Sequence, residues 1–241
     1  MNTETTRLGD PLRLARTLRR LQAQVQPGDL GTESLEQFVR RYSRVRAPAL
    51  DLQLESRYDP SWPEHFEHEK RRLQAALAGA DLAAIEHIGS TAVPGLASKN
   101  ILDIAVAMHT ASAADGLTRA LASLGYVAHG ESPIAAEFSW HWRVGQEGGT
   151  TFVVHTCAAA HPRLAELTNF RDFLRAFPEE RQAYVALKRA LAEVPHPSWL
   201  EYSALKKVLV VQITARANAW RTALPSATAP DSVIAAECGL A

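Results

Sequence analysis

The sequence predicts a mixed α/β domain with helical segments added at both ends. Between residues 84 and 155, short apolar runs of strand length alternate with helical pieces, which is typical of an α/β protein. Three stretches with helix-start signals follow from Pro162 onward, and the first 50 or so residues carry a helical pattern of their own. We therefore expect a helical extension over 1–56, one domain over 57–221 and a flexible tail, rich in Ala, Ser, Thr and Pro, over 222–241.

The N-terminal segment is expected to form two helices. Asp10 and Pro11 suit the cap and first position of a helix that runs to about Gln26. Ser34 and Gln37 have the spacing of a capping box for a second helix. Residues 1–50 contain nine arginines and five acidic residues, which favours a solvated face or a surface for a protein partner over an RNA-binding arm.

The domain itself is expected to begin with a helix after Pro60 and Pro63 and to alternate strands with helices from there. The expected elements are a helix over 64–77, a strand over 84–88, a turn and short helix over 90–97, a strand over 101–108, a helix over 113–124, a short strand from 126, a hairpin of strands over 136–144 and 151–155, and helices over 162–176, 178–193 and 198–220.

The first strand of the hairpin alternates between two sets of side chains. The aromatic set is Phe138, Trp140 and Trp142, and the polar set is Glu137, Ser139, His141 and Arg143. A period of two is typical of a strand with one buried face and one face in water. We expect the polar, wet face to form a wall of the functional site.

Composition excludes several classes of protein. The chain has 26 basic and 26 acidic residues, so it has no overall field to attract nucleic acid or an anionic membrane. No apolar run reaches the roughly 20 residues that a bilayer crossing needs, and the N-terminus lacks the apolar core of a signal peptide. Two cysteines, Cys157 and Cys238, are too few for a disulfide framework or a zinc cage. We expect a cytoplasmic protein with free thiols.

The segment 85–104 contains the residues with the clearest chemical meaning. A buried strand ends in a turn at Gly89 and Ser90, where the backbone, the hydroxyl and free N–H groups could hold a phosphate. The next strand carries Asp103 among apolar neighbours, where a carboxylate is costly unless it is paired or bound to a cation such as a divalent metal. A plain turn, with Asp103 paired to Lys99, is the alternative.

The longer pattern resembles the GrpB family, a branch of the polymerase-beta-like nucleotidyltransferase superfamily. The matching segments are Tyr58-Asp59-Pro60-Ser61-Trp62, His87 to Gly95, Lys99, Leu102-Asp103-Ile104, Asn169 to Arg175, Pro178, Tyr184 to Lys188 and Tyr202 to Lys206. The resemblance covers about residues 57 to 220. It implies a nucleotidyltransferase-like mixed sheet flanked by helices.

The resemblance also implies the site residues and cofactors. Asp103 would hold Mg²⁺, and ATP or another nucleoside triphosphate would bind at the turn. The nucleotide-binding residues it implies are Gly89, Ser90, Thr91, Lys99, Arg171, Arg175 and Lys206. Arg171 or Arg175 would form a bidentate fork on the triphosphate, with Asp172 orienting it, and Lys188 is a further candidate cation.

Two positions depart from the pattern. Ala105 stands where active members of the wider superfamily carry a second carboxylate, and Glu137 is the best replacement as catalytic group and metal ligand. Val153 replaces the first histidine of the family's His-x-His strand, which leaves His155 for proton transfer or phosphate contact. His87, beside the turn, is expected to have a structural role.

The expected function is an enzyme that uses a nucleoside triphosphate and Mg²⁺ to transfer a nucleotidyl or phosphoryl group to a small acceptor, or to activate that acceptor by adenylation. The alternative is a non-catalytic module that binds nucleotide or protein. Transfer RNA binding is weaker, because the overall charge is neutral. A serine hydrolase is excluded, since Gly89-Ser90-Thr91 is not a Gly-x-Ser-x-Gly elbow.

Overall fold

The computed structural model describes residues 5–6, 47–48, 57–109, 114–131, 138–145, 149–192 and 199–224. The helices are α3 (Trp62–Ala76), α4 (Ala114–Ser123), α5 (Pro162–Ala176), α6 (Pro178–Ala192) and α7 (Trp199–Ala223), with a single 3₁₀ turn, η1 (Ser90–Ala92). The strands are β1 (Thr5–Thr6), β2 (Ala47–Pro48), β3 (Leu82–Ile88), β4 (Ile101–Met108), β5 (Val127–Glu131), β6 (Ser139–Arg143) and β7 (Thr151–Ala158).

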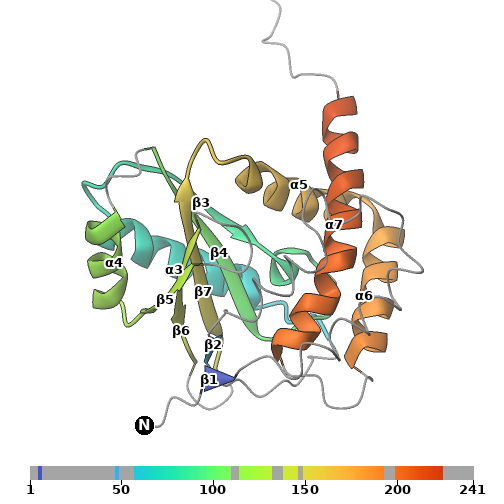
Figure 1. The fold of residues 1–241 in the computed structure, drawn as a ribbon, viewed down its shortest axis with the longest axis horizontal. Coiled ribbons are helices and arrows are strands. Elements are labelled where there is room, and N and C mark those ends of the chain that lie inside the picture. The colour runs from blue at the N-terminus through green and yellow to red at the C-terminus, as the bar shows by residue number, and fades with distance from the viewer. Residues whose placement is uncertain are drawn as a thin grey trace, which may run out of the picture.

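The domain is built on a five-stranded mixed sheet in the order β3-β4-β7-β6-β5 (Figure 1). The central pair, β4 and β7, is parallel, and the other neighbours are antiparallel. Helices α3 and α4 pack on one face of the sheet, while α5 packs on the other and α6 and α7 pack against α5. The expected mixed α/β architecture and the hairpin of β6 with β7 are both confirmed.

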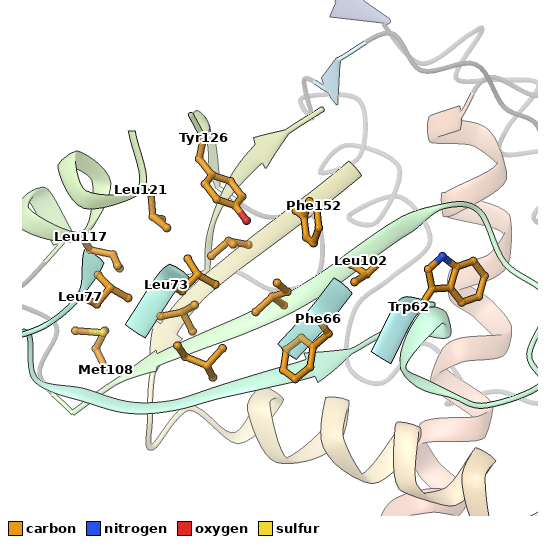
Figure 2. Close-up of a cluster of buried hydrophobic side chains, with 14 residues drawn as sticks. Trp62, Phe66, Leu73, Leu77, Leu102, Met108, Leu117, Leu121, Tyr126 and Phe152 are labelled. Carbon is orange, nitrogen blue, oxygen red and sulfur yellow. The ribbon is translucent and has the colours of Figure 1, made fainter. Parts of the chain in front are cut away.

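The larger core fills the space between α3, α4 and the sheet (Figure 2). It gathers aromatic and aliphatic side chains from both helices and from β3, β4 and β7, and their removal from water stabilises this layer. Trp62 closes one end of the cluster, and its indole N–H donates to Asn100 Oδ1 at 3.0 Å. This bond ties the start of α3 to the residue before β4.

A second core joins the three C-terminal helices to the segment that follows η1. Val93 and Leu96 from that segment pack with Phe170 and Leu174 of α5 and with Ile213 of α7. The C-terminal helices therefore lie against the turn between β3 and β4. This contact brings side chains from α5, α6 and α7 to the region that the sequence predicts as the site.

The prediction that one face of β6 is exposed to water is wrong. Trp140 and Trp142 are buried, as predicted, but His141 on the opposite face is buried as well. The reason is that this face lies toward α3, because Val154, the partner of His141 in the sheet, belongs to the core under α3 and α4, and Arg143 bonds to Glu69 of α3. The register places Trp142, Val153 and Asp103 in one row across the sheet, so the tryptophan face is the one that carries Asp103.

Other predictions fall outside the described residues. They are the helices expected over residues 11–26 and from Ser34, residue Glu137, the thiol of Cys238 and the tail from 225. In the N-terminal segment, the described residues of β1 and β2 pair antiparallel, which the helical pattern did not predict. Cys157 is a free, buried thiol, and burial raises its pKa to about 11.

Within the described part of the chain, no helix combines the length and apolar character that a bilayer crossing requires.

Glu69 is the centre of a buried polar cluster on the α3 side of the sheet. Its carboxylate is 1% exposed. It accepts hydrogen bonds from Arg72 at 2.8 Å, from the Tyr126 hydroxyl at 2.9 Å and from Arg143 on β6. The cluster therefore links α3 to the far strands of the sheet.

We predict that Glu69→Ala lowers the free energy of unfolding by about 3 kcal/mol, because removing one partner of a buried ion pair leaves the others uncompensated. Urea unfolding followed by circular dichroism measures this loss. Glu67→Ala is the matched control, since Glu67 is exposed on the same helix. Equal midpoints for the two variants would show that the cluster contributes nothing.

Candidate functional site

The Gly89 turn and the Asp103 carboxylate meet where β3 ends and β4 begins. Ile88, the last residue of β3, pairs with Asp103 on β4. Gly89 then turns the chain with φ +73° and ψ −167°, a conformation that is essentially restricted to glycine. A Cβ at Gly89 would lie 2.5 Å from Asp103 Oδ2. The backbone of the turn is thus in direct contact with the carboxylate.

Asp103 is open to solvent on one side and supported on the other. Its side chain is 32% exposed, and Oδ1 lies 3.4 Å from Nε2 of His155 on β7. His155 is buried, and its ring stacks on Trp140 of β6 with 6.3 Å between centroids. The histidine therefore holds the carboxylate from within the sheet, while the other oxygen faces the turn.

The two arginines predicted to bind triphosphate contact the turn itself. Arg175 donates from Nε and Nη2 to the carbonyl of Ala92, at 3.0 and 2.7 Å. Arg171 donates from Nη1 to Glu86 at 2.7 Å and to the carbonyl of His87 at 3.0 Å. Their guanidinium groups thus hold the two ends of the turn. Phosphate binding by these arginines stays a prediction.

Thr91 and His87 fix the turn by hydrogen bonds to each other and to the start of β4. The Thr91 hydroxyl donates to the carbonyl of Ile101 at 3.2 Å, and His87 Nε2 lies 3.0 Å from the same hydroxyl. Because the hydroxyl proton is used on Ile101, His87 donates from Nε2 to Thr91 Oγ1. Burial lowers the pKa of His87 to about 4, with the charge of Asp103 opposing and those of Arg175 and Arg171 adding.

The ring of His87 stacks on Phe66, with 4.6 Å between the ring centroids. At neutral pH this imidazole is therefore a neutral, buried part of the fold. This position agrees with the structural role expected for His87. Thr91, which is hydrogen-bonded to His87, also has a structural role.

Tyr184 is a site residue that sequence reasoning did not single out. It is buried, and its hydroxyl forms a hydrogen bond with the side chain of Ser90. Burial raises the pKa of the Tyr184 hydroxyl, the Ser90 bond lowers it, and the charge of Asp103 raises it further. The sequence signal that could have identified Tyr184 is its spacing from Lys188, since residues four apart share one helix face.

Lys188 lies beside Tyr184, and the charges of two lysines from other segments, Lys99 and Lys206, interact with it. Lys188 of α6 is 3% exposed, its ammonium lies 5.1 Å from the centroid of the Tyr184 ring, and it donates to the carbonyl of Ala97. Burial, followed by the charge of Lys206 on α7, lowers the pKa of Lys188 to about 7. Burial, followed by Lys206 and Lys188, lowers the pKa of Lys99 to about 7 as well.

The structure thus brings most of the predicted residues into one region. Those it gathers around the turn and its flank are Gly89, Ser90, Thr91, Asp103, His155, Arg171, Arg175, Lys99 and Lys206. Glu137 belongs to the residues that the structure leaves undescribed. Lys188, expected as a further candidate cation, lies beside Tyr184 in the same region, and Tyr184 is the residue found in addition.

Comparison with known proteins identifies relatives over most of this region. A family model described as GrpB protein matches residues 54–216. The UPF0157 protein SCO7215 of Streptomyces coelicolor is 37% identical over 173 residues, which covers 72% of this chain and 88% of that protein.

A solved structure of a GrpB protein shows the same fold. The crystal structure of the conserved protein GrpB from Enterococcus faecalis aligns with a TM-score of 0.60 and 28% identity, covering 68% of this chain and 98% of the other. Terminal uridylyl transferase 4 from Trypanosoma brucei with bound CTP aligns with a TM-score of 0.41 and 16% identity, over 65% of this chain and 51% of the other, which is too distant to bear on function.

We predict that Gly89→Ala lowers the free energy of unfolding by more than Gly79→Ala does. Both glycines have positive φ, so both variants carry a strain of about 1 to 3 kcal/mol. Only at Gly89 would the new methyl group collide with Asp103, because nothing lies within 4 Å of a Cβ at Gly79. Thermal unfolding of both variants measures the difference.

The double variant Gly89→Ala/Asp103→Ala serves as the control. Shortening the Asp103 side chain removes the collision, so the double variant should recover part of the loss. Equal losses for the two glycine variants, or strictly additive losses in the double variant, would contradict the close contact.

Proposed function

Because the chain belongs to the GrpB family, we propose that it binds a nucleoside triphosphate, with ATP as the expected nucleotide, together with Mg²⁺, and transfers a nucleotidyl or phosphoryl group to a small acceptor. The observation that carries this proposal is the contact between the Gly89 backbone and the Asp103 carboxylate. It brings a turn able to receive a phosphate and a group able to bind a cation into one place.

The residues fit a magnesium ion that arrives with the phosphates. Among the described residues, no group of three or more His, Cys, Asp and Glu side chains could hold a metal ion. Mg²⁺ is commonly bound by one or two carboxylates together with substrate phosphates and waters. Asp103, one third exposed beside the turn, supplies one such carboxylate. When bound, the ion would neutralise phosphate charge during transfer.

The protein's own residues would act by positioning. His155 orients Asp103, while Arg171 and Arg175 hold the two ends of the turn. With the phosphates fixed there, an acceptor atom would form a bond to one phosphorus as the bond from that phosphorus to its leaving group breaks. The leaving group is pyrophosphate in nucleotidyl transfer and the nucleoside diphosphate in phosphoryl transfer. Phosphoryl chemistry of this kind depends mainly on positioning and charge neutralisation.

A nucleotide-binding module without catalysis is the second candidate. It is favoured by Ala105, which is fully buried on β4 and carries no carboxylate where a second metal ligand would help catalysis. Both candidates require binding, and only the enzyme releases pyrophosphate, after nucleotidyl transfer, or ADP, after phosphoryl transfer. Measuring that release with ATP, Mg²⁺ and a panel of small acceptors distinguishes them.

We predict that Asp103→Asn weakens Mg²⁺-dependent ATP binding at least about tenfold. Replacing even an outer-shell partner of a metal ion lowers metal affinity by about tenfold or more, and Asp103 would contact the ion directly. Isothermal titration calorimetry, with and without EDTA, measures the affinity. Mg²⁺ alone should show no binding to the wild type. The unfolding midpoint should stay near that of the wild type, because the side chain is partly exposed.

Asp81→Asn provides the matched control, since Asp81 is exposed just before β3. This variant should bind ATP and Mg²⁺ as the wild type does. If Asp103→Asn binds ATP in the presence of Mg²⁺ as tightly as the wild type does, the site assignment is wrong.

A further inference from the structure

Glu86 is an acidic side chain of β3 to which the proposed function gives no role. β3 and β4 pair antiparallel, with Ile88 opposite Asp103 and Glu86 opposite Ala105. Because residues two apart on a strand point to the same side, Glu86 lies on the same face of the sheet as Asp103. It therefore stands directly across from the position on β4 that carries Ala105 and no second carboxylate.

The contact between His155 and Asp103 shows how far side chains reach across this face. His155 lies opposite Ala105 from the other neighbouring strand, β7, so it is a diagonal neighbour of Asp103. Its Nε2 nonetheless lies 3.4 Å from Asp103 Oδ1. Glu86 is the corresponding diagonal neighbour of Asp103 on β3, and diagonal neighbours remain within reach of long side chains. Ala105 has only a methyl group, so β4 places no long side chain between the two carboxylates.

Arg171 of α5 fixes the position of Glu86. Its Nη1 donates to Glu86 Oε2 at 2.7 Å and to the carbonyl of His87 at 3.0 Å. Arg171 is largely buried, whereas the side chain of Glu86 is 38% exposed. With the described residues, Glu86 Oε1 makes no hydrogen bond or ion pair. The carboxylate is thus held through one oxygen and can offer the other to a ligand, as a preorganised site requires.

Two carboxylates on one face beside the turn favour a cation. Their like charges repel each other, and a cation that contacts both removes this repulsion. Mg²⁺ prefers oxygen ligands and is usually held by one or two carboxylates together with phosphates and waters. Asp103 and Glu86, from neighbouring strands, can supply the pair of carboxylates that β4 alone does not.

We propose that Glu86 is the second carboxylate of the site and that it binds, together with Asp103, the Mg²⁺ that arrives with the nucleotide. This inference rests on the proposed function. The alternative role for Glu86 is to join β3 to α5 through its ion pair with Arg171. Nucleotide binding measured with and without metal separates the two roles.

Glu86→Gln removes the charge but keeps the shape of the side chain and an oxygen for Arg171. In Mg²⁺, the ATP affinity of this variant should fall at least about tenfold, as expected when a partner of a bound metal is lost. In EDTA, the variant should bind ATP no more weakly than the wild type, because a carboxylate that repels phosphate is gone. Isothermal titration calorimetry of the full chain measures both affinities. Equal losses in Mg²⁺ and in EDTA, or no loss in Mg²⁺, would overturn the proposal.

Mn²⁺ in place of Mg²⁺ reports on the ligands of the ion directly. Water-proton relaxation, measured with Mn²⁺ and ATP at saturating protein, reports how much water the bound ion carries. Glu86→Ala should show more water on the ion than the wild type does, because water replaces the lost carboxylate. The same amount of water in both proteins would show that Glu86 does not contact the metal.

Glu166→Gln is the matched control. The Glu166 side chain is 37% exposed and is ion-paired with an arginine of α5, Arg163, so it resembles Glu86 in exposure and in pairing. Its replacement should leave ATP affinity unchanged with and without metal, and an equal loss there would count against Glu86. Glu137→Gln examines the carboxylate that the sequence favoured for this role. A metal-dependent loss in Glu137→Gln but not in Glu86→Gln would overturn the proposal.

The same measurements separate this inference from the proposed function. A metal-dependent loss in Asp103→Asn but not in Glu86→Gln would reject the role of Glu86 and retain the proposed function. A wild type whose ATP binding ignores Mg²⁺ would reject both. The double variant Glu86→Gln/Asp103→Asn should lose little beyond Asp103→Asn, because residues that share one ion are coupled. Strictly additive losses would contradict a shared ion.

Discussion

The contact between a positive-φ glycine and a strand carboxylate is the constraint on which the rest of the site depends. Antiparallel pairing of β3 and β4 places Ile88 opposite Asp103, so the chain must turn directly beside the carboxylate. Gly89 makes this turn because it has no Cβ to collide with Asp103. Any other residue would have to push the carboxylate away from the turn or distort the end of β3.

The surrounding layers preserve that contact from two sides. On the α3 side, Thr91 bonds to Ile101 and His87 packs on Phe66, so the turn is joined to the larger core. On the other side, Arg171 and Arg175 from α5 bond to carbonyls at its ends. A short irregular segment is thereby held by the regular elements of both layers, as a binding site that must keep its shape requires.

The sequence was informative where structure is local. Periodicity and capping signals predicted β4 over 101–108 and α5 over 162–176 with the bounds that the structure has. The glycine turn and the strand aspartate were predicted from neighbouring residues, and they do lie together. These features depend on a few adjacent residues, which is why a single sequence can reveal them.

What the sequence did not predict depends on tertiary packing. A period of two in β6 separates two faces but does not say which face a helix covers, so the site was expected beside His141 and not beside Trp142. The arginine pattern of α5 could not indicate that the turn's own carbonyls would be the partners. The burial of Tyr184 depends on the packing of α6 against the segment that follows η1, which a single position cannot reveal.

The parallel pairing of β4 with β7 has a consequence for how the site assembles. Asp103 lies on β4 and His155 on β7, and between these strands the chain makes a long excursion through α4, β5 and β6. Closing so long a loop costs chain entropy that local structure cannot recover, and such high contact order slows folding. The carboxylate and its histidine therefore meet only when the central sheet closes. Competence to bind a ligand should consequently arise cooperatively with the whole domain, and no fragment that stops before β7 can possess it.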